Sequence, residues 1–253
     1  MRQEAAGRAR RTKEGCIMTF ALILVVTVAA TFALRNPIKK WPALFYALAV
    51  LVDVLFVAGS FLELPRLLWS ALFLLVQKCT LSLALFIVVM YIGVFARDSK
   101  VQLWLKPIRA ELSIIAWILS LGHMAVYLVS YLPRITAGGS MHDNVMVSFV
   151  VALVLFVLLL ALGVTSFNAV KKRMRTESWK RLQRLAYAFF ALVYVHLLLM
   201  LLPSALHGGQ VAQASVAVYS VVFVAYFVLR VVRALLDRRA TQATPAMGEA
   251  PAA

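Results

Sequence analysis

The sequence predicts an all-α membrane protein, a polytopic helix bundle with about seven transmembrane helices. Hydrophobic residues make up 63% of the 253 residues, charged residues only 14%, and the mean hydropathy is +0.90. Soluble globular domains are less apolar and more charged than this. Seven apolar segments follow one another, and most approach the ~20 residues that cross a bilayer: 17–34, 42–62, 68–96, 111–132, 145–165, 184–203 and 213–236.

Polar stretches flank this predicted bundle at both ends of the chain. Residues 1–16 are basic and lack apolar periodicity, so we expect a disordered leader there. Residues 237–253 are rich in Ala, Pro and Thr and offer nothing to bury, so a disordered tail is expected. Residues 17–236 remain as the transmembrane domain.

The basic residues predict the orientation of the bundle. The formal net charge is +16, but Lys and Arg cluster between apolar segments, which indicates contact with anionic lipid and a cytoplasmic location rather than nucleic-acid binding. Residues 166–184 carry seven Lys or Arg, whereas residues 203–215 carry none. The sixth segment therefore runs outward from the cytoplasm, which predicts a multi-pass membrane protein with a cytoplasmic C-terminus.

The leader conflicts with this orientation, because it would place five Lys or Arg outside the cell. Three explanations stay open. The first apolar segment does not span the membrane, or translation starts naturally at Met18, or the chain begins with a cleaved signal peptide. The cluster of Arg35, Lys39 and Lys40 after the apolar run is unusual for a signal peptide.

Two histidines lie inside the predicted helices at matching depth. His123 in the fourth segment and His196 in the sixth are each about twelve residues from the cytoplasmic start. At ~1.5 Å per residue, both lie roughly 18 Å into the membrane. Two imidazoles at one level can hold a planar metal complex between parallel helices. One haem b with His123 and His196 as axial iron ligands fits this pattern.

Neighbouring residues on the same helices are candidates to pack against the haem. Gly122 and Ser120 lie on or beside the His123 face and would let the ring approach. Phe189 and Met200 lie on the His196 face as bulkier partners. The alternative is that each histidine makes a structural hydrogen bond across helices. Zinc is less well supported, since it takes three or four ligands and no Cys, Asp or Glu lies at this level.

Three motifs together resemble a known superfamily: IRAELSIIAWILSLGH (108–123), LGVTSF (162–167) and WKRLQRLAYAFFALVYVH (179–196). They are similar to the ferric reductase-like transmembrane domain, which occurs in NADPH oxidases, ferric reductases and the haem subunit of periplasmic methionine sulfoxide reductase. The resemblance covers segments two to seven and implies a six-helix core plus one N-terminal helix. It also implies a stand-alone bacterial haem protein of membrane electron transport, located in the inner (plasma) membrane.

The resemblance further implies one haem rather than two. In two-haem members, each of two helices carries two histidines about fourteen residues apart. His123 and His196 match the outer pair, whereas Arg109 and Gln183 stand at the inner positions. Neither Arg nor Gln is an ordinary haem ligand, so the second haem is not expected.

A separate electron donor is expected, because no flavin and nicotinamide module follows the last segment and no GxGxxG follows a strand. The chain is then an electron-transfer component of an oxidoreductase without catalytic residues of its own. Electrons would come from quinol or a soluble flavoprotein reductase and pass to an extracytoplasmic acceptor protein. His142 and His207, in external loops, are expected to be solvated or to lie near that acceptor.

Two more ionisable residues, Asp53 and Lys78, fall within segments two and three. An isolated charge there costs several kcal/mol, so we predict that they form an ion pair. The pair would be structural or would relay protons. The relay defines the alternative function, a transporter or small-molecule-binding membrane protein in which these residues and the histidines move protons. Arg109 and Arg184 would anchor the interface or contact a quinone or donor flavoprotein.

Overall fold

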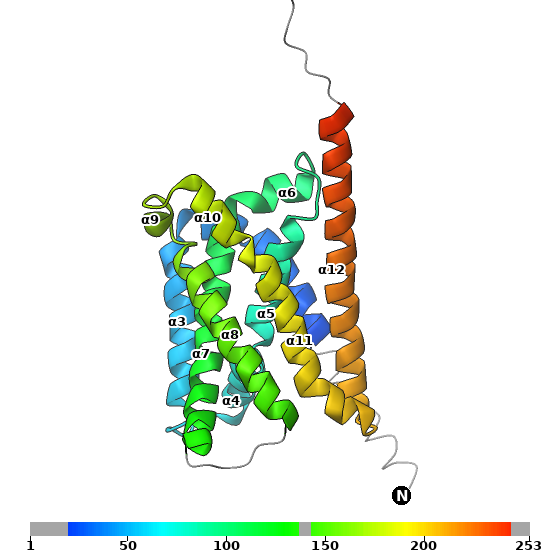
Figure 1. The fold of residues 1–253 in the computed structure, drawn as a ribbon. Coiled ribbons are helices and arrows are strands. Elements are labelled where there is room, and N and C mark those ends of the chain that lie inside the picture. The colour runs from blue at the N-terminus through cyan, green and yellow to red at the C-terminus, as the bar shows by residue number, and fades with distance from the viewer. Residues whose placement is uncertain (1–19, 137–142, 244–253) are drawn as a thin grey trace, which may run out of the picture.

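The computed structural model describes residues 20–136 and 143–243, and every regular element in these ranges is a helix (Figure 1). The predicted leader, residues 1–16, lies outside the described residues, as does His142. The first half of the described chain contains a helix at Phe20–Ala33, α2 (Arg35–Lys40), α3 (Pro42–Ala58), α4 (Arg66–Leu72), the π-helix η1 (Phe73–Gln77), α5 (Thr80–Ile92), α6 (Lys100–Leu105) and the 3₁₀-helix η2 (Lys106–Ile108). The second half contains α7 (Arg109–Thr136), α8 (Asp143–Val164), α9 (Asn168–Lys171), α10 (Thr176–Gln183), α11 (Leu185–Leu206) and α12 (Gln210–Ala243).

The predicted fold class is confirmed, and each of the seven apolar segments contains helix. Four helical stretches of the described chain are long and apolar enough to cross a membrane, namely Lys100–Thr136, Asp143–Val164, Thr176–Leu206 and Gln210–Ala240. A fifth span results if the bent pair Arg66–Gln77 and Thr80–Ile92 counts as one. Phe20–Ala33 and Pro42–Ala58 are shorter apolar helices. The protein is therefore a multi-pass membrane bundle.

The third apolar segment is broken, although the sequence predicts it as one long span. Its two parts meet at an angle of 43°. The π-helix ends at Gln77, and Cys79 has a φ of 54°, in the left-handed region that non-glycine residues seldom adopt. A left-handed residue interrupts the α-helical ladder, so α5 starts afresh at Thr80.

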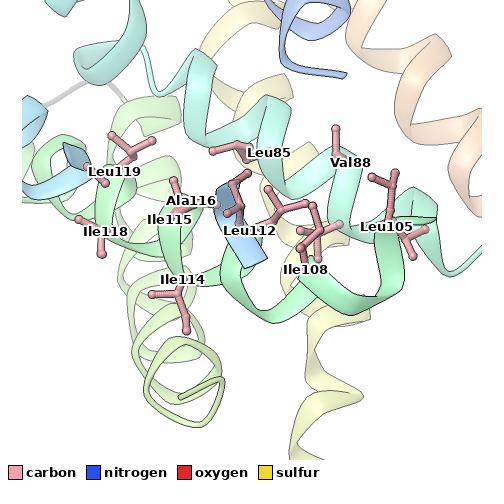
Figure 2. Close-up of a cluster of buried hydrophobic side chains, with 14 residues drawn as sticks. Leu85, Val88, Leu105, Ile108, Leu112, Ile114, Ile115, Ala116, Ile118 and Leu119 are labelled. Carbon is pink, nitrogen blue, oxygen red and sulfur yellow. The ribbon is translucent and has the colours of Figure 1, made fainter. Parts of the chain in front are cut away.

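The segment after this break forms a tight seam with α7. Figure 2 shows Leu85 and Val88 of α5 beside Leu112 and Ala116 of α7 in the largest buried cluster. Ser82, which is fully buried, donates its hydroxyl to the Ala116 carbonyl at 2.6 Å. Small side chains at this seam let the two backbones approach closely. The seam holds α7 rigidly against α5.

A second group of helices surrounds α11. Phe190 of α11 packs against Phe223 in a tilted arrangement and against Tyr226 of α12 edge-on, with ring centroids 4.4 and 4.8 Å apart. Tyr91 of α5 donates to the Val222 carbonyl at 2.7 Å. This hydrogen bond connects α12 to the group of helices formed by α3, α5 and α7. Helix α11 packs mainly on α8 and α12, whereas α7 packs mainly on α3 and α5. The helices that carry His123 and His196 thus belong to different packing groups.

One end of the bundle carries α6, α9 and α10, and α12 extends past them (Figure 1). We call it the basic end, because residues 166–184 with their seven Lys or Arg lie there. Helix α12 continues to Ala243, beyond the predicted limit at residue 236. An ion pair one turn apart, Arg233 to Asp237 at 2.8 Å, supports this extension. The start of the predicted tail is therefore helical.

Candidate functional site

His123 and His196 lie near the middle of α7 and α11, as their spacing predicts. They are close enough to interact electrostatically. Because α7 and α11 pack on other partners, the two imidazoles approach across the junction of the two helix groups. Helical spacing and loop charge alone therefore identified two residues that the fold brings near each other.

The His123 ring is oriented by the break between η1 and α5. Its Nδ1 lies 2.6 Å from the Gln77 carbonyl oxygen. No backbone N–H of the described chain donates to that carbonyl, since the ladder is interrupted at Lys78 and Cys79. A carbonyl only accepts, so Nδ1 carries the proton and Nε2 has a free lone pair. The helix break thus determines both the direction and the tautomer of His123.

His196 is oriented from α8. Its Nδ1 lies 3.0 Å from Ser148 Oγ and 3.3 Å from the carbonyl oxygen of the same residue. Ser148 is only 1% exposed, so its geometry is well determined by packing. A proton on Nδ1 satisfies both oxygens, because the carbonyl can only accept. As with His123, the free lone pair is on Nε2.

Sequence reasoning did not identify Gln77 or Ser148. Gln77 acts through its backbone carbonyl, which leaves no side-chain signature. The polar run from Gln77 to Thr80 within an apolar segment was the available signal for a break.

Within residues 20–136 and 143–243, neither histidine Nε2 has a hydrogen-bond partner. Two oriented imidazoles with free Nε2 atoms are the arrangement that metal-binding histidines adopt.

The space between α7 and α11 on the basic-end side of the histidines is filled by aromatic and aliphatic side chains. Phe189 of α11 is buried and meets Phe86 of α5 edge-on, with centroids 5.3 Å apart. Trp117 of α7 belongs to the same cluster and meets Phe167 edge-on at 5.8 Å. Leu155 and Leu159 complete it from α8. This packing leaves the two histidines as the only imidazoles among the described residues of the bundle interior.

Arg109 and Gln183, at the inner positions of the two-haem pattern, do not face each other as a pair. The Gln183 side chain donates to Thr165 Oγ1 at 3.3 Å and so fastens α10 to the end of α8. Arg109 instead lies near Tyr187, Tyr226 and Arg230. Both residues therefore have surroundings unlike that of His123 and His196.

The predicted packing residues have different positions in the fold. Phe189 lies in the cluster described above, and Ser120 is buried with its hydroxyl bonded to the Trp117 carbonyl at 2.7 Å. Met200 is 41% exposed. Gly122 faces α3, because a Cβ there would lie 2.5 Å from Asp53 Oδ1 and 3.0 Å from Val76. Gly122 thus serves the contact with α3 and not the approach to α11.

Asp53 contacts the backbone beside His123. Its Oδ2 accepts from the Gly122 N–H at 3.2 Å, while Oδ1 is buried without a hydrogen-bond partner.

The predicted ion pair of Asp53 with Lys78 is not formed in the described chain. The Lys78 ammonium lies 5.6 Å from the Phe73 ring centroid instead. The left-handed turn at Cys79 follows Lys78 directly, and the helix geometry on which the predicted pairing relied ends there.

The remaining candidate ligands do not extend the site. His207 is exposed, and its Nδ1 bonds to the Pro203 carbonyl of its own helix at 2.7 Å. No group of three or more His, Cys, Asp or Glu is placed to hold a metal ion within the described ranges. A site with two histidine ligands on opposite faces of a macrocycle does not require such a group.

Comparison with known proteins agrees with the sequence resemblance. Residues 78–195 match the sequence model of the family described as "Ferric reductase like transmembrane component". The chain is also 35% identical over 225 residues to an "Uncharacterized protein" of Treponema pallidum (strain Nichols). That alignment covers 88% of this chain and 62% of the relative, so the chain spans less than two thirds of the relative's length. No solved structure matches significantly.

The fold and the match define a class: a helical, multi-pass membrane protein. Residues 78–195, which begin directly after η1 and run from α5 to the middle of α11, match the family of ferric reductase-like transmembrane components. The predicted resemblance is confirmed over this range. The family match suggests a role in membrane electron transfer. The matched range includes His123 and ends one residue before His196.

Proposed function

We propose that the protein is the haem b subunit of a membrane oxidoreductase and transfers electrons within or across the membrane. One observation carries the proposal. His123 and His196 approach each other from two packing groups, and each is oriented through Nδ1 so that Nε2 is free. Metal-bound histidines commonly donate their second ring N–H to a carbonyl or other oxygen, which orients the ring and raises its basicity.

The residues present fit one haem with two histidine ligands. His123 and His196 would hold the iron, and the Gln77 carbonyl and Ser148 would keep both rings in the binding tautomer. When bound, the haem would supply one-electron chemistry at iron. Phe86 and Phe189 keep water away on the basic-end side of the histidines. The chain's own part is to orient the ligands and to exclude water.

A single haem is proposed because the inner level offers no ligand pair. Arg109 lies among tyrosines and Arg230, and Gln183 is bonded to Thr165. The aromatic cluster around Trp117 and Phe189 fills the intervening space. These contacts support the expectation from the sequence that only the outer level holds a cofactor.

The proposed donor and acceptor are assigned with the orientation that the basic residues predict. The positive-inside rule puts the basic end and the C-terminus in the cytoplasm of a bacterial cell, with the bundle in the inner membrane. We propose that quinol or a soluble flavoprotein reductase donates electrons and that an extracytoplasmic protein accepts them. The relay alternative is not supported by a pairing of Asp53 with Lys78, because each contacts a different group.

The optical spectrum of the purified protein tests the proposal directly. Protein produced with ample haem is expected to show a Soret band and, after reduction, the sharp α band of low-spin haem b. A pyridine haemochrome assay should give about one haem per chain, as one pair of ligands allows. Protein that is folded by circular dichroism and shows neither band would refute the proposal.

Ser148→Ala is expected to weaken haem binding without abolishing it. The substitution removes the hydroxyl 3.0 Å from His196 Nδ1 but leaves the carbonyl at 3.3 Å. Loss of a group that orients a ligand typically lowers affinity by 10- to 100-fold, and the retained carbonyl favours the lower figure, about tenfold. Haem titration of the apoprotein measures this. Ser215→Ala is the matched control, because Ser215 bonds only within its own helix, to Val211. An equal loss of haem affinity in both variants would exclude a role for Ser148 in orienting His196.

A further inference from the structure

Two arginines meet at the basic end, away from the histidine pair. Arg230 of α12 donates from Nε and Nη2 to the Tyr187 hydroxyl of α11, at 3.1 and 2.8 Å. Arg109, the first residue of α7, is close enough to Arg230, Tyr187 and Tyr226 to interact electrostatically with each of them. Three helices thus bring two guanidinium groups and two tyrosines together.

No carboxylate balances these two positive charges. Glu111, the acidic residue nearest to Arg109 on α7, interacts with Tyr46 of α3. Asp237, further along α12, forms its ion pair with Arg233. In the described parts of the chain no ion pair includes Arg109 or Arg230, and the Arg109 guanidinium has no hydrogen-bond acceptor. Two neighbouring cations repel each other when no anion lies between them. A negatively charged ligand would therefore stabilise this cluster.

We propose that Arg109 and Arg230 bind a phosphate group at the basic end, where α7, α11 and α12 meet. Planar guanidinium groups bind phosphate oxygens through paired N–H donors, and such charge-assisted hydrogen bonds are about twice as strong as neutral ones. Arg109 lies just before the fourth apolar segment, and Arg230 directly follows the uninterrupted apolar run 221–229 of α12, near the depth at which lipid headgroups lie. A phospholipid headgroup and a soluble phosphate are the two sources of this chemistry.

The phosphate site is separate from the histidine pair. Tyr187 precedes His196 by nine residues on α11, which places it ~13 Å closer to the basic end. None of its residues contacts His123, Gln77 or Ser148 through a hydrogen bond. The proposal therefore stands whether or not the chain binds haem.

Native mass spectrometry of the full chain in detergent tests the site. The delipidated protein is titrated with phosphatidylglycerol, with phosphatidylcholine, or with inorganic phosphate as a competitor. Wild-type protein should bind phosphatidylglycerol, and Arg109→Gln or Arg230→Gln should each weaken that binding about tenfold, the size expected for one charge-assisted hydrogen-bonding group. Arg233→Gln is the control, because Arg233 already has Asp237 as its anion, and it should bind as wild type does.

Competition identifies the source of the phosphate. If millimolar inorganic phosphate displaces the lipid only when both arginines are present, the site takes free phosphate as well. If it does not displace the lipid, the headgroup is the ligand. A double Arg109→Lys, Arg230→Lys variant keeps the charge and guards against misfolding, and it should bind more weakly than wild type because the planar forks are gone. Binding unchanged in the Arg109→Gln and Arg230→Gln variants and in the double Lys variant would overturn the proposal.

Discussion

Replacing either His123 or His196 with alanine is expected to abolish the low-spin haem spectrum. Each histidine would supply one axial nitrogen, and the two come from helices α7 and α11 of different packing groups. No other described imidazole lies within the bundle to substitute for a lost one. The α band of the reduced protein should therefore disappear in both variants, and haem content should fall, as measured by absorption and pyridine haemochrome on protein checked by circular dichroism.

His207→Ala is the matched control for these variants. His207 is exposed at the end of α11, and its Nδ1 bonds to the Pro203 carbonyl of the same helix. Its removal should leave both bands unchanged. A low-spin spectrum that persists in both His123→Ala and His196→Ala would show that the haem ligands are elsewhere.

The position of each histidine along its helix was predictable from the sequence because it depends on local geometry. Helical rise and loop charge together define depth, and both histidines lie about midway along their helices. The helical bundle was predictable for the same reason, since hydropathy over ~20 residues determines whether a segment is stable in lipid, although within the described chain only four or five of the seven apolar segments are long enough to span. These properties depend on the residues of one helix and not on its neighbours.

Contacts between helices were not predictable in the same way. Gly122 is adjacent to His123 and is small, which suggested a role beside the ring, but its missing Cβ makes room for Asp53 of α3. Asp53 in turn bonds to a backbone N–H, a group that every residue but proline has. Sequence spacing shows which residues share a helix face and does not show which neighbour that face meets.

The break before α5 shows how one such contact serves the proposed site. Cys79 in the left-handed region leaves the Gln77 carbonyl without a backbone donor, at a depth where water does not supply one. His123 Nδ1 satisfies it. Since an unpaired carbonyl is costly in a membrane, the break and the histidine stabilise each other. The break within the polar run from Gln77 to Thr80 thus provides the acceptor for His123.

Gly163→Ala is expected to destabilise the bundle strongly through a single methyl group. Gly163 of α8 lies against the face of α7 that carries Trp117, and a Cβ there would overlap the Trp117 indole ring. A rigid aromatic ring, held edge-on by Phe167 at 5.8 Å, cannot yield as a flexible side chain does. Overpacking a tight contact typically costs about 1–3 kcal/mol, and the free energy of unfolding should fall by that amount in thermal or SDS denaturation.

Two further variants separate overpacking from a general effect of alanine for glycine. At Gly93, an added Cβ meets only the Met90 carbonyl at an ordinary 3.4 Å, so Gly93→Ala should leave stability nearly unchanged. Trp117→Ala removes the ring that blocks position 163, and it should recover part of the loss when combined with Gly163→Ala. Because neighbouring residues couple in double-mutant cycles, the double variant should be more stable than the sum of the single losses predicts. Strict additivity would mean that the indole is not what the alanine methyl meets, and α7 and α8 would then have to be separated at this level by other side chains.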